Sequence, residues 1–143
     1  GEMDATHIYV PMSGYQKVDY VYNEASGEYL RYQYNGQKHV DNTNKEQLSF
    51  KNVILLFCKT YVYDAGGRLK IDTVGTGTGY LISEGKATVI TWSRTDKDGN
   101  MTLTNTATGE NIVINRGKTA INVCPLTITN DVKLNATERQ MNG

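Results

Sequence analysis

The chain is 143 residues long and carries 15 Lys and Arg against 15 Asp and Glu, so its formal net charge at pH 7 is zero. This length suits one domain whose core needs no metal or disulfide to hold it. Balanced charge without a long basic stripe argues against nucleic acid and anionic lipid as partners. The longest apolar run, Val53 to Cys58, is far shorter than the ~20 residues of a membrane-spanning helix.

The N-terminus and the cysteines say little about compartment. Gly1 to Asp4 is acidic and no apolar stretch follows, so no signal peptide is predicted, and Gly1 before Glu2 is typical of a cloning remnant that could have replaced native targeting residues. Cys58 and Cys124 could form one disulfide, but both lie in or at the end of apolar runs, which favours free buried thiols. Two cysteines are too few for a structural zinc cluster, and we expect no metal or cofactor.

Composition and turn chemistry predict strands. Thr, Val, Tyr and Ile greatly outnumber Leu and Ala, and branched or aromatic side chains suit a pleated, half-buried surface. Short segments containing Gly, Asp or Asn cut the chain at close intervals, as hairpin turns do. The predicted strands are Ile8–Val10, Val18–Asn23, Glu28–Asn35, Val53–Tyr63, Leu69–Val74, Gly79–Ser83, Ala87–Ser93, Met101–Asn105, Glu110–Ile114 and Thr119–Val123.

These segments predict an all-β fold, an antiparallel meander of hairpins that forms a sandwich or a partly open barrel. Antiparallel pairing is favoured because a parallel crossover needs a dozen or more residues. At most one short helix is expected, near residues 44–52. The expected organisation is a single β domain over residues 1–125, followed by a polar, extended or partly disordered C-terminal tail over residues 126–143. Val53–Tyr63 is apolar on both alternating faces, which predicts a central strand at the core.

Two glycine-containing segments imitate phosphate loops. A phosphate loop must open a helix, whereas Gly75 to Gly79 is followed by a predicted strand, so a tight bend or bulge is the expected structure. Gly117-Lys118-Thr119 lacks the glycine that a P-loop requires at position 112, which is Ile112, and a strand again follows. Neither segment predicts nucleotide binding.

His39 and Asp41 are the one pair of residues that suggests acid and base chemistry. They lie two residues apart and would share a face of an extended segment, where they could pair or bind a ligand together. The alternative is a hydrogen bond that orders a loop. Two groups do not make a catalytic set, Cys58 has no adjacent base, and no Gly-x-Ser-x-Gly elbow is present.

Ten tyrosines are more than a small core requires. A four-residue loop at Glu24–Gly27 would pair Asn23 with Glu28 and Tyr22 with Tyr29, and would place Tyr20 opposite Arg31. The predicted binding residues are therefore Tyr20, Tyr22, Tyr29 and Arg31 on one hairpin face, His39 and Asp41 in the following loop, and Trp92. Such a face could stack on a sugar or a partner side chain, although cross-strand aromatic pairs also stabilise sheets and Trp92 could equally fill the core.

Several segments together resemble the C-terminal domain of the YerB-like lipoproteins, a bacterial family of unestablished function. The matching segments, in order, are Tyr29-x-Arg31, Gly36-x-x-His39-x-Asp41, Asn52-Val53-Ile54, Gly75-x-Gly77-x-Gly79-Tyr80-Leu81, Gly85-Lys86 with Trp92, and Gly109-Glu110 leading to Asn115-x-Gly117-Lys118-Thr119. The family pattern Asn-Pro-Gly-x-Thr-Trp has Arg116 here for its proline and Ala120 for its tryptophan. The resemblance implies an extracytoplasmic parent, anchored to the membrane through a lipidated N-terminal part outside this chain, and gives no catalytic residues.

These observations predict a non-catalytic domain of the cell envelope that binds a protein partner or a wall-associated polymer. One alternative is an enzyme acting on an envelope substrate, with His39 and Asp41 as acid and base. Another is a purely architectural domain that supports a missing N-terminal neighbour.

Overall fold

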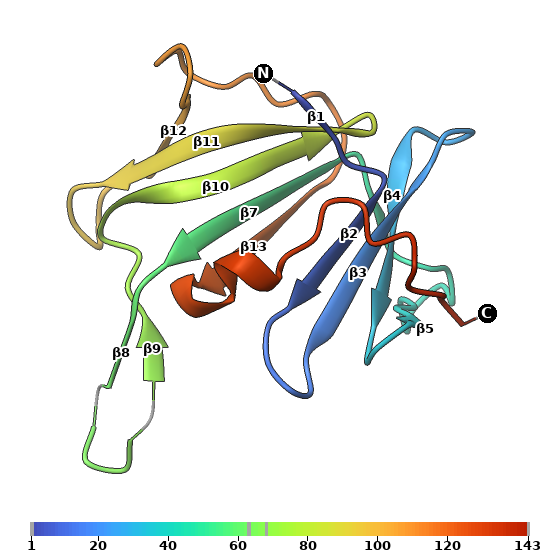
Figure 1. Ribbon diagram of the computed structural model, residues 1–143, viewed down its shortest axis with the longest axis horizontal. Helices are drawn as coiled ribbons and strands as arrows, with labels where there is room; N and C mark the ends of the chain where they lie inside the picture. Colours follow the sequence, from blue (N-terminus) through green and yellow to red (C-terminus); the bar gives the residue numbers. More distant parts are fainter. Residues whose placement is uncertain (1, 63, 68, 143) are drawn as a thin grey trace.

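The computed structural model of the protein describes residues 2–62, 64–67 and 69–142. Two sheets pack face to face (Figure 1). The first sheet has the order β1 (Met3–Asp4), β11 (Lys86–Arg94), β10 (Gly75–Ser83), β7 (Asn52–Cys58) and β13 (Thr119–Pro125), with β12 (Thr102–Asn105) also paired to β11. The second sheet has the order β2 (His7–Pro11), β3 (Lys17–Asn23), β4 (Glu28–Gln33) and β5 (Gln37–Lys38), with β6 (Ser49–Phe50) also paired to β4. A separate hairpin of β8 (Thr60–Val62) and β9 (Leu69–Ile71) extends beyond the end of β7 (Figure 1).

The predicted all-β, mainly antiparallel architecture is confirmed, and neither sheet closes into a barrel. One pairing departs from a meander: β13 lies parallel to β7, with Ile121 opposite Ile54. About sixty residues separate the two strands in sequence, so this crossover is long enough for parallel pairing.

Strand β7 forms the centre of the molecule, as its sequence predicts. All seven of its residues are buried. Val53, Leu55 and Phe57 face the second sheet, whereas Ile54, Leu56 and Cys58 belong to a second cluster on the outer face of the first sheet. The predicted strand Val53–Tyr63 ends earlier than expected, since β7 and β8 are separate strands and Tyr63 lies outside the described residues.

Three predicted segments differ from the structure. The short helix expected near residues 44–52 is replaced by a turn, an isolated Val40–Gln47 bridge and strand β6, because the backbone there closes onto residues 39–41. Residues 110–114 form no strand and instead cross the outer face of the first sheet, where Ile112 packs on its apolar cluster. The glycines expected in a bend at residues 75–79 lie inside β10. The helical element of the described residues is the short 3-10 helix η1 (Leu126–Asp131), and none of their helices is long and apolar enough to span a membrane.

Both cysteines are free and buried. Cys124 pairs with Phe57 across the β13–β7 ladder, so its side chain lies on the Phe57 face of the sheet, while Cys58 faces the opposite side. Burial raises the pKa of Cys124 to about 12. A disulfide between these two positions would require one strand to change register.

The segment after η1 packs against the edge of the second sheet. Tyr9 and Lys133 exchange two backbone hydrogen bonds of 2.8 and 3.1 Å, and the Ala136 amide donates to the His7 carbonyl at 2.8 Å. Ala136 is fully buried. The segment therefore covers the edge of β2, which would otherwise present unpaired backbone groups.

Gly77 and Trp92 explain why a glycine-rich stretch forms a strand. Trp92 lies opposite Gly77 in the β10–β11 ladder, is 2% exposed and donates its indole N–H to the Phe57 carbonyl at 3.0 Å. A Cβ on residue 77 would come within 2.5 Å of the indole nitrogen. The absence of a side chain at Gly77 therefore lets the Trp92 ring, which belongs to β11, lie across β10 and reach β7.

Gly77→Ala is expected to destabilise the domain by about 2 kcal/mol, because the indole must move and its hydrogen bond must weaken. Urea unfolding monitored by Trp fluorescence measures this change. Gly14→Ala is the control, since nothing lies within 4 Å of a Cβ at that position. Equal stability of the two variants would contradict the packing described.

Candidate functional site

The predicted tyrosine hairpin forms with the predicted register. Asn23 pairs with Glu28, Tyr22 with Tyr29 and Tyr20 with Arg31. The Asn23 side chain accepts from the amide of Ala25 at 3.0 Å, and Gly27 closes the loop at a φ of 71°.

The aromatic face of this hairpin lies between the two sheets. Tyr20 and Tyr29 are 1% and 0% exposed, and Tyr22 contacts Tyr29 with ring centroids 5.0 Å apart. The Tyr29 hydroxyl donates to the Ala5 carbonyl at 2.7 Å and accepts from the Gly85 amide at 3.0 Å, and burial raises its pKa. Tyr20 and Tyr29 thus lie in the core between the two sheets, whereas Trp92 is buried in the cluster on the outer face of the first sheet. A binding role for these three residues stays a prediction.

Arg31 and His39 contact each other at the mouth of the sandwich, the open end where the start of β3 and the end of β4 lie beside β13. Arg31 Nη1 lies 3.0 Å from His39 Nδ1, and the guanidinium carbon lies 5.6 Å from the Tyr20 ring centroid. Because arginine can only donate, Nδ1 must accept and the imidazole must be neutral in this contact. Burial and the nearby Arg31 charge both lower the pKa of His39.

Asp41 does not join this pair. Its carboxylate accepts from the Thr43 amide at 2.7 Å, and its backbone N–H donates to the Glu46 carbonyl at 2.8 Å. Among the described residues, no hydrogen bond or ion pair links Asp41 to His39. Asp41 thus orders its own turn, and the structure does not bring its carboxylate into hydrogen-bonding contact with His39.

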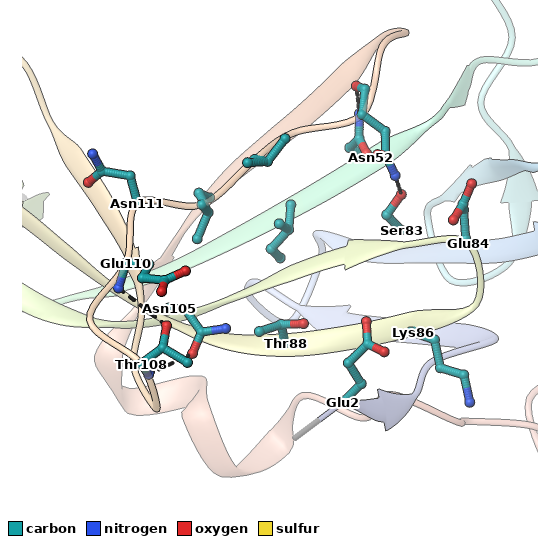
Figure 2. Close-up of a pocket in the computed structure, with 14 residues that line it drawn as sticks. Glu2, Asn52, Ser83, Glu84, Lys86, Thr88, Asn105, Thr108, Glu110 and Asn111 are labelled. Carbon is teal, nitrogen blue, oxygen red and sulfur yellow. Dashed lines mark hydrogen bonds between the residues drawn. The ribbon is translucent and has the colours of Figure 1, made fainter.

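A polar cleft lies on the opposite side of the first sheet from the aromatic core. Figure 2 shows the side chains that line it. Its volume is about 310 Å³. Strands β10 and β11 form its floor, and residues 105–115 form a wall that crosses over them. The lining combines amides, hydroxyls, carboxylates, one ammonium and a few apolar groups, from Asn52, Asn105, Asn111, Asn115, Ser83, Thr88, Thr108, Glu2, Glu84, Glu110, Lys86, Leu81, Ile112 and Val113.

Asn52 attaches the wall of this cleft to its floor. Its side chain is fully buried and donates to the Asn115 carbonyl at 2.8 Å and to the Thr119 hydroxyl at 3.2 Å. Asn115 in turn donates to Ser83 at 2.9 Å. The Oδ1 atom of Asn52 is buried without a hydrogen-bond partner. Asn52 was not predicted from the sequence as a site residue. The signal that could have found it is an Asn at the start of an otherwise apolar strand, because a buried amide needs hydrogen-bond partners.

The charges around the cleft leave an excess of hydrogen-bond acceptors. Lys86 pairs with Asp4, and Glu84 pairs with Lys51 at 3.3 Å. Among the described residues, Glu110 forms no ion pair. Carboxylates only accept, whereas amides and hydroxyls both accept and donate. The cleft therefore suits a ligand rich in hydrogen-bond donors.

A buried ionic cluster around Asp19 holds the C-terminal segment against the second sheet. Asp19 is fully buried and accepts from His7 at 2.7 Å and from Arg139 Nε and Nη2 at 2.7 and 2.8 Å. The Arg139 guanidinium also stacks 3.8 Å from the Tyr9 ring centroid. Burial alone would raise the pKa of Asp19, but the hydrogen bonds from Arg139 and His7 outweigh it and lower that pKa.

Comparison with known proteins gives the family. Residues 8–121 match the family described as a protein of unknown function (DUF3048), C-terminal domain. The chain belongs to this family. The YerB protein from Bacillus subtilis, known from a crystal structure, superposes with a TM-score of 0.75 at 22% sequence identity, over 87% of this chain and 43% of the YerB chain. This DUF3048 C-terminal domain thus spans less than half of the YerB chain it matches, and the predicted YerB-like resemblance is confirmed. No curated protein matches the chain.

Arg139→Gln is expected to destabilise the domain by about 3 kcal/mol, because it leaves the buried Asp19 carboxylate with one charged partner fewer. Since the lowered Asp19 pKa stabilises the folded state above the ordinary Asp pKa, the acid unfolding midpoint should also move to higher pH. Urea and pH titrations measure both effects. Arg116→Gln, at an exposed position, is the control and should change neither.

His39 should make stability fall as the pH drops below the ordinary His pKa of about 6.5. The folded pKa is lowered, so the unfolded chain takes up a proton first as pH falls, and stability declines until the folded His39 is protonated as well. His39→Gln keeps an acceptor for Arg31 without a titrating ring and should flatten the decline in Tm. An identical decline in both proteins would refute the assignment.

Proposed function

We propose that this domain is a non-catalytic binding module of a cell-envelope lipoprotein and that it holds a hydroxyl-rich, wall-associated polymer in the polar cleft. The excess of acceptors around the cleft carries the proposal, since sugar hydroxyls are donors that carboxylates and amide oxygens accept. The resemblance to YerB-like lipoproteins supports the envelope setting and anchoring through a part of the parent outside this chain.

The cleft favours recognition by hydrogen bonds over stacking. Its lining, among the described residues, contains no aromatic side chain, and the tyrosines that were predicted to stack on a sugar lie mainly in the core. Its polar groups also come from separate elements fixed to one another through Asn52 and Asn115. A wall attached in this way keeps its groups in position before the ligand arrives, which reduces the entropy lost on binding.

The proposal is tested by titrating the labelled domain with soluble oligosaccharides, such as chitotriose and maltotriose, and following backbone amide shifts. Binding should move the amides of β10, β11 and residues 105–115. The double variant Thr88→Val, Glu110→Gln removes a hydroxyl and a charge from the lining. It should raise Kd about thirtyfold, since two weakened hydrogen bonds of about 1 kcal/mol each amount to about 2 kcal/mol.

Thr127→Val combined with Glu24→Gln makes the same chemical changes at exposed positions and should leave Kd unchanged. The proposal fails if no oligosaccharide moves the cleft amides while an envelope protein binds the domain equally well with and without the two cleft substitutions. Such a result would favour a protein partner instead.

A further inference from the structure

We propose that a second cavity, at the mouth of the sandwich beside Arg31 and Lys17, binds an oxyanion, either a carboxylate or a phosphate group. This cavity has a volume of about 200 Å³ and lies between the start of β3, the end of β4 and the middle of β13. It shares no lining residue with the polar cleft, so the inference does not depend on the proposed polymer site.

Arg31 has unused hydrogen-bonding capacity at this position. Its Nη1 atom is engaged by His39 at 3.0 Å, and its Nε atom is buried without any hydrogen-bond partner. The edge of the guanidinium formed by Nε and Nη2 is the one that pairs with two oxygens of a carboxylate or a phosphate. Nη1 is engaged by the imidazole and the Tyr20 hydroxyl lies close to the guanidinium, so the edge that includes Nε is the part of Arg31 assigned to the ligand. Because Nε is buried, the side chain must turn toward the cavity to use this edge.

The cavity carries positive charge that the protein does not neutralise. Arg31 and Lys17 both line it, and no Asp or Glu is in the lining. No ion pair formed by the described residues includes either cation. Two cations without carboxylates in a half-enclosed cavity raise the local concentration of anions.

The remaining polar side chains of the lining are uncharged, three amides and the Tyr34 phenol. Gln33 comes from the second sheet, Gln16 from the loop before β3, and Asn122 from the first sheet, so the two sheets meet around the cavity. The Asn122 amide lies 2.9 and 3.2 Å from the Tyr20 hydroxyl, which fixes it beside the Arg31 side chain that contacts the same ring. Amide N–H groups can donate to the oxygens that a guanidinium leaves unpaired.

His39 positions the guanidinium for this task. Its Nδ1 accepts from Arg31, and its backbone is held on both sides, since its N–H donates to the Arg31 carbonyl at 3.1 Å and its carbonyl accepts from Leu48 at 2.8 Å. A neutral acceptor orients the arginine without cancelling its charge. A carboxylate in place of His39 would pair with Arg31 and would compete with an anionic ligand.

The test follows the Nε–Hε signal of Arg31 by NMR while sodium phosphate, sodium acetate or sodium chloride is added at constant ionic strength. A saturable shift with phosphate or acetate, absent with chloride, is expected, and the tighter of the two identifies the preferred oxyanion. Arg31→Lys keeps the charge but loses the paired donors, so Kd for that anion, followed by backbone amides of β3 and β4, should rise about tenfold. Lys17→Gln should raise it about threefold.

Arg116→Lys and Lys97→Gln make the same substitutions at exposed positions and serve as matched controls. Should Arg31→Lys fail to fold, the Arg31 signal and Lys17→Gln still decide the question. The proposal is wrong if all three salts shift the Arg31 signal alike without saturation, or if Arg31→Lys and Lys17→Gln bind phosphate and acetate as the native domain does.

Discussion

Burial of β7 on both faces is the constraint on which the rest of the structure depends. A strand with seven consecutive buried residues needs a cover on each side. The second sheet covers one side, and the segment around Leu103 and Ile112 covers the other. Both proposed sites follow from this arrangement, because one lies where the outer cover meets the sheet and the other where the two sheets part.

The sequence predicted those parts of the fold that are encoded by neighbouring residues. The loop at Glu24–Gly27 fixed the register of its hairpin, since an Asn that caps the turn and a Gly at positive φ permit few alternatives. The apolar run at residues 53–58 predicted the central strand, because a strand that is apolar on both faces must be covered on both. Both features are local, so no tertiary information was needed.

Features that depend on distant contacts were not predicted. Alternation placed Tyr20, Tyr22, Tyr29 and Arg31 on one face but could not say that this face points inward. Gly77 is explained only by a tryptophan fifteen residues away, and Asp19 by an arginine 120 residues away. Among the candidate site residues, Arg31 and His39 were predicted from the sequence. Asn52 and the wall of the cleft could be identified only from the folded structure, because their contacts join distant segments.

The parallel neighbour of β7 has a consequence for how the chain acquires its structure. β10 and β11 can pair with β7 soon after they leave the ribosome, but β13 lies more than sixty residues after β7. Until then, an apolar strand has one open edge in the nascent chain, and such edges are sites of intermolecular association. Pairing of β13, which begins in the last fifth of the polypeptide, is therefore the closing step of folding, and contacts of such long sequence separation slow it.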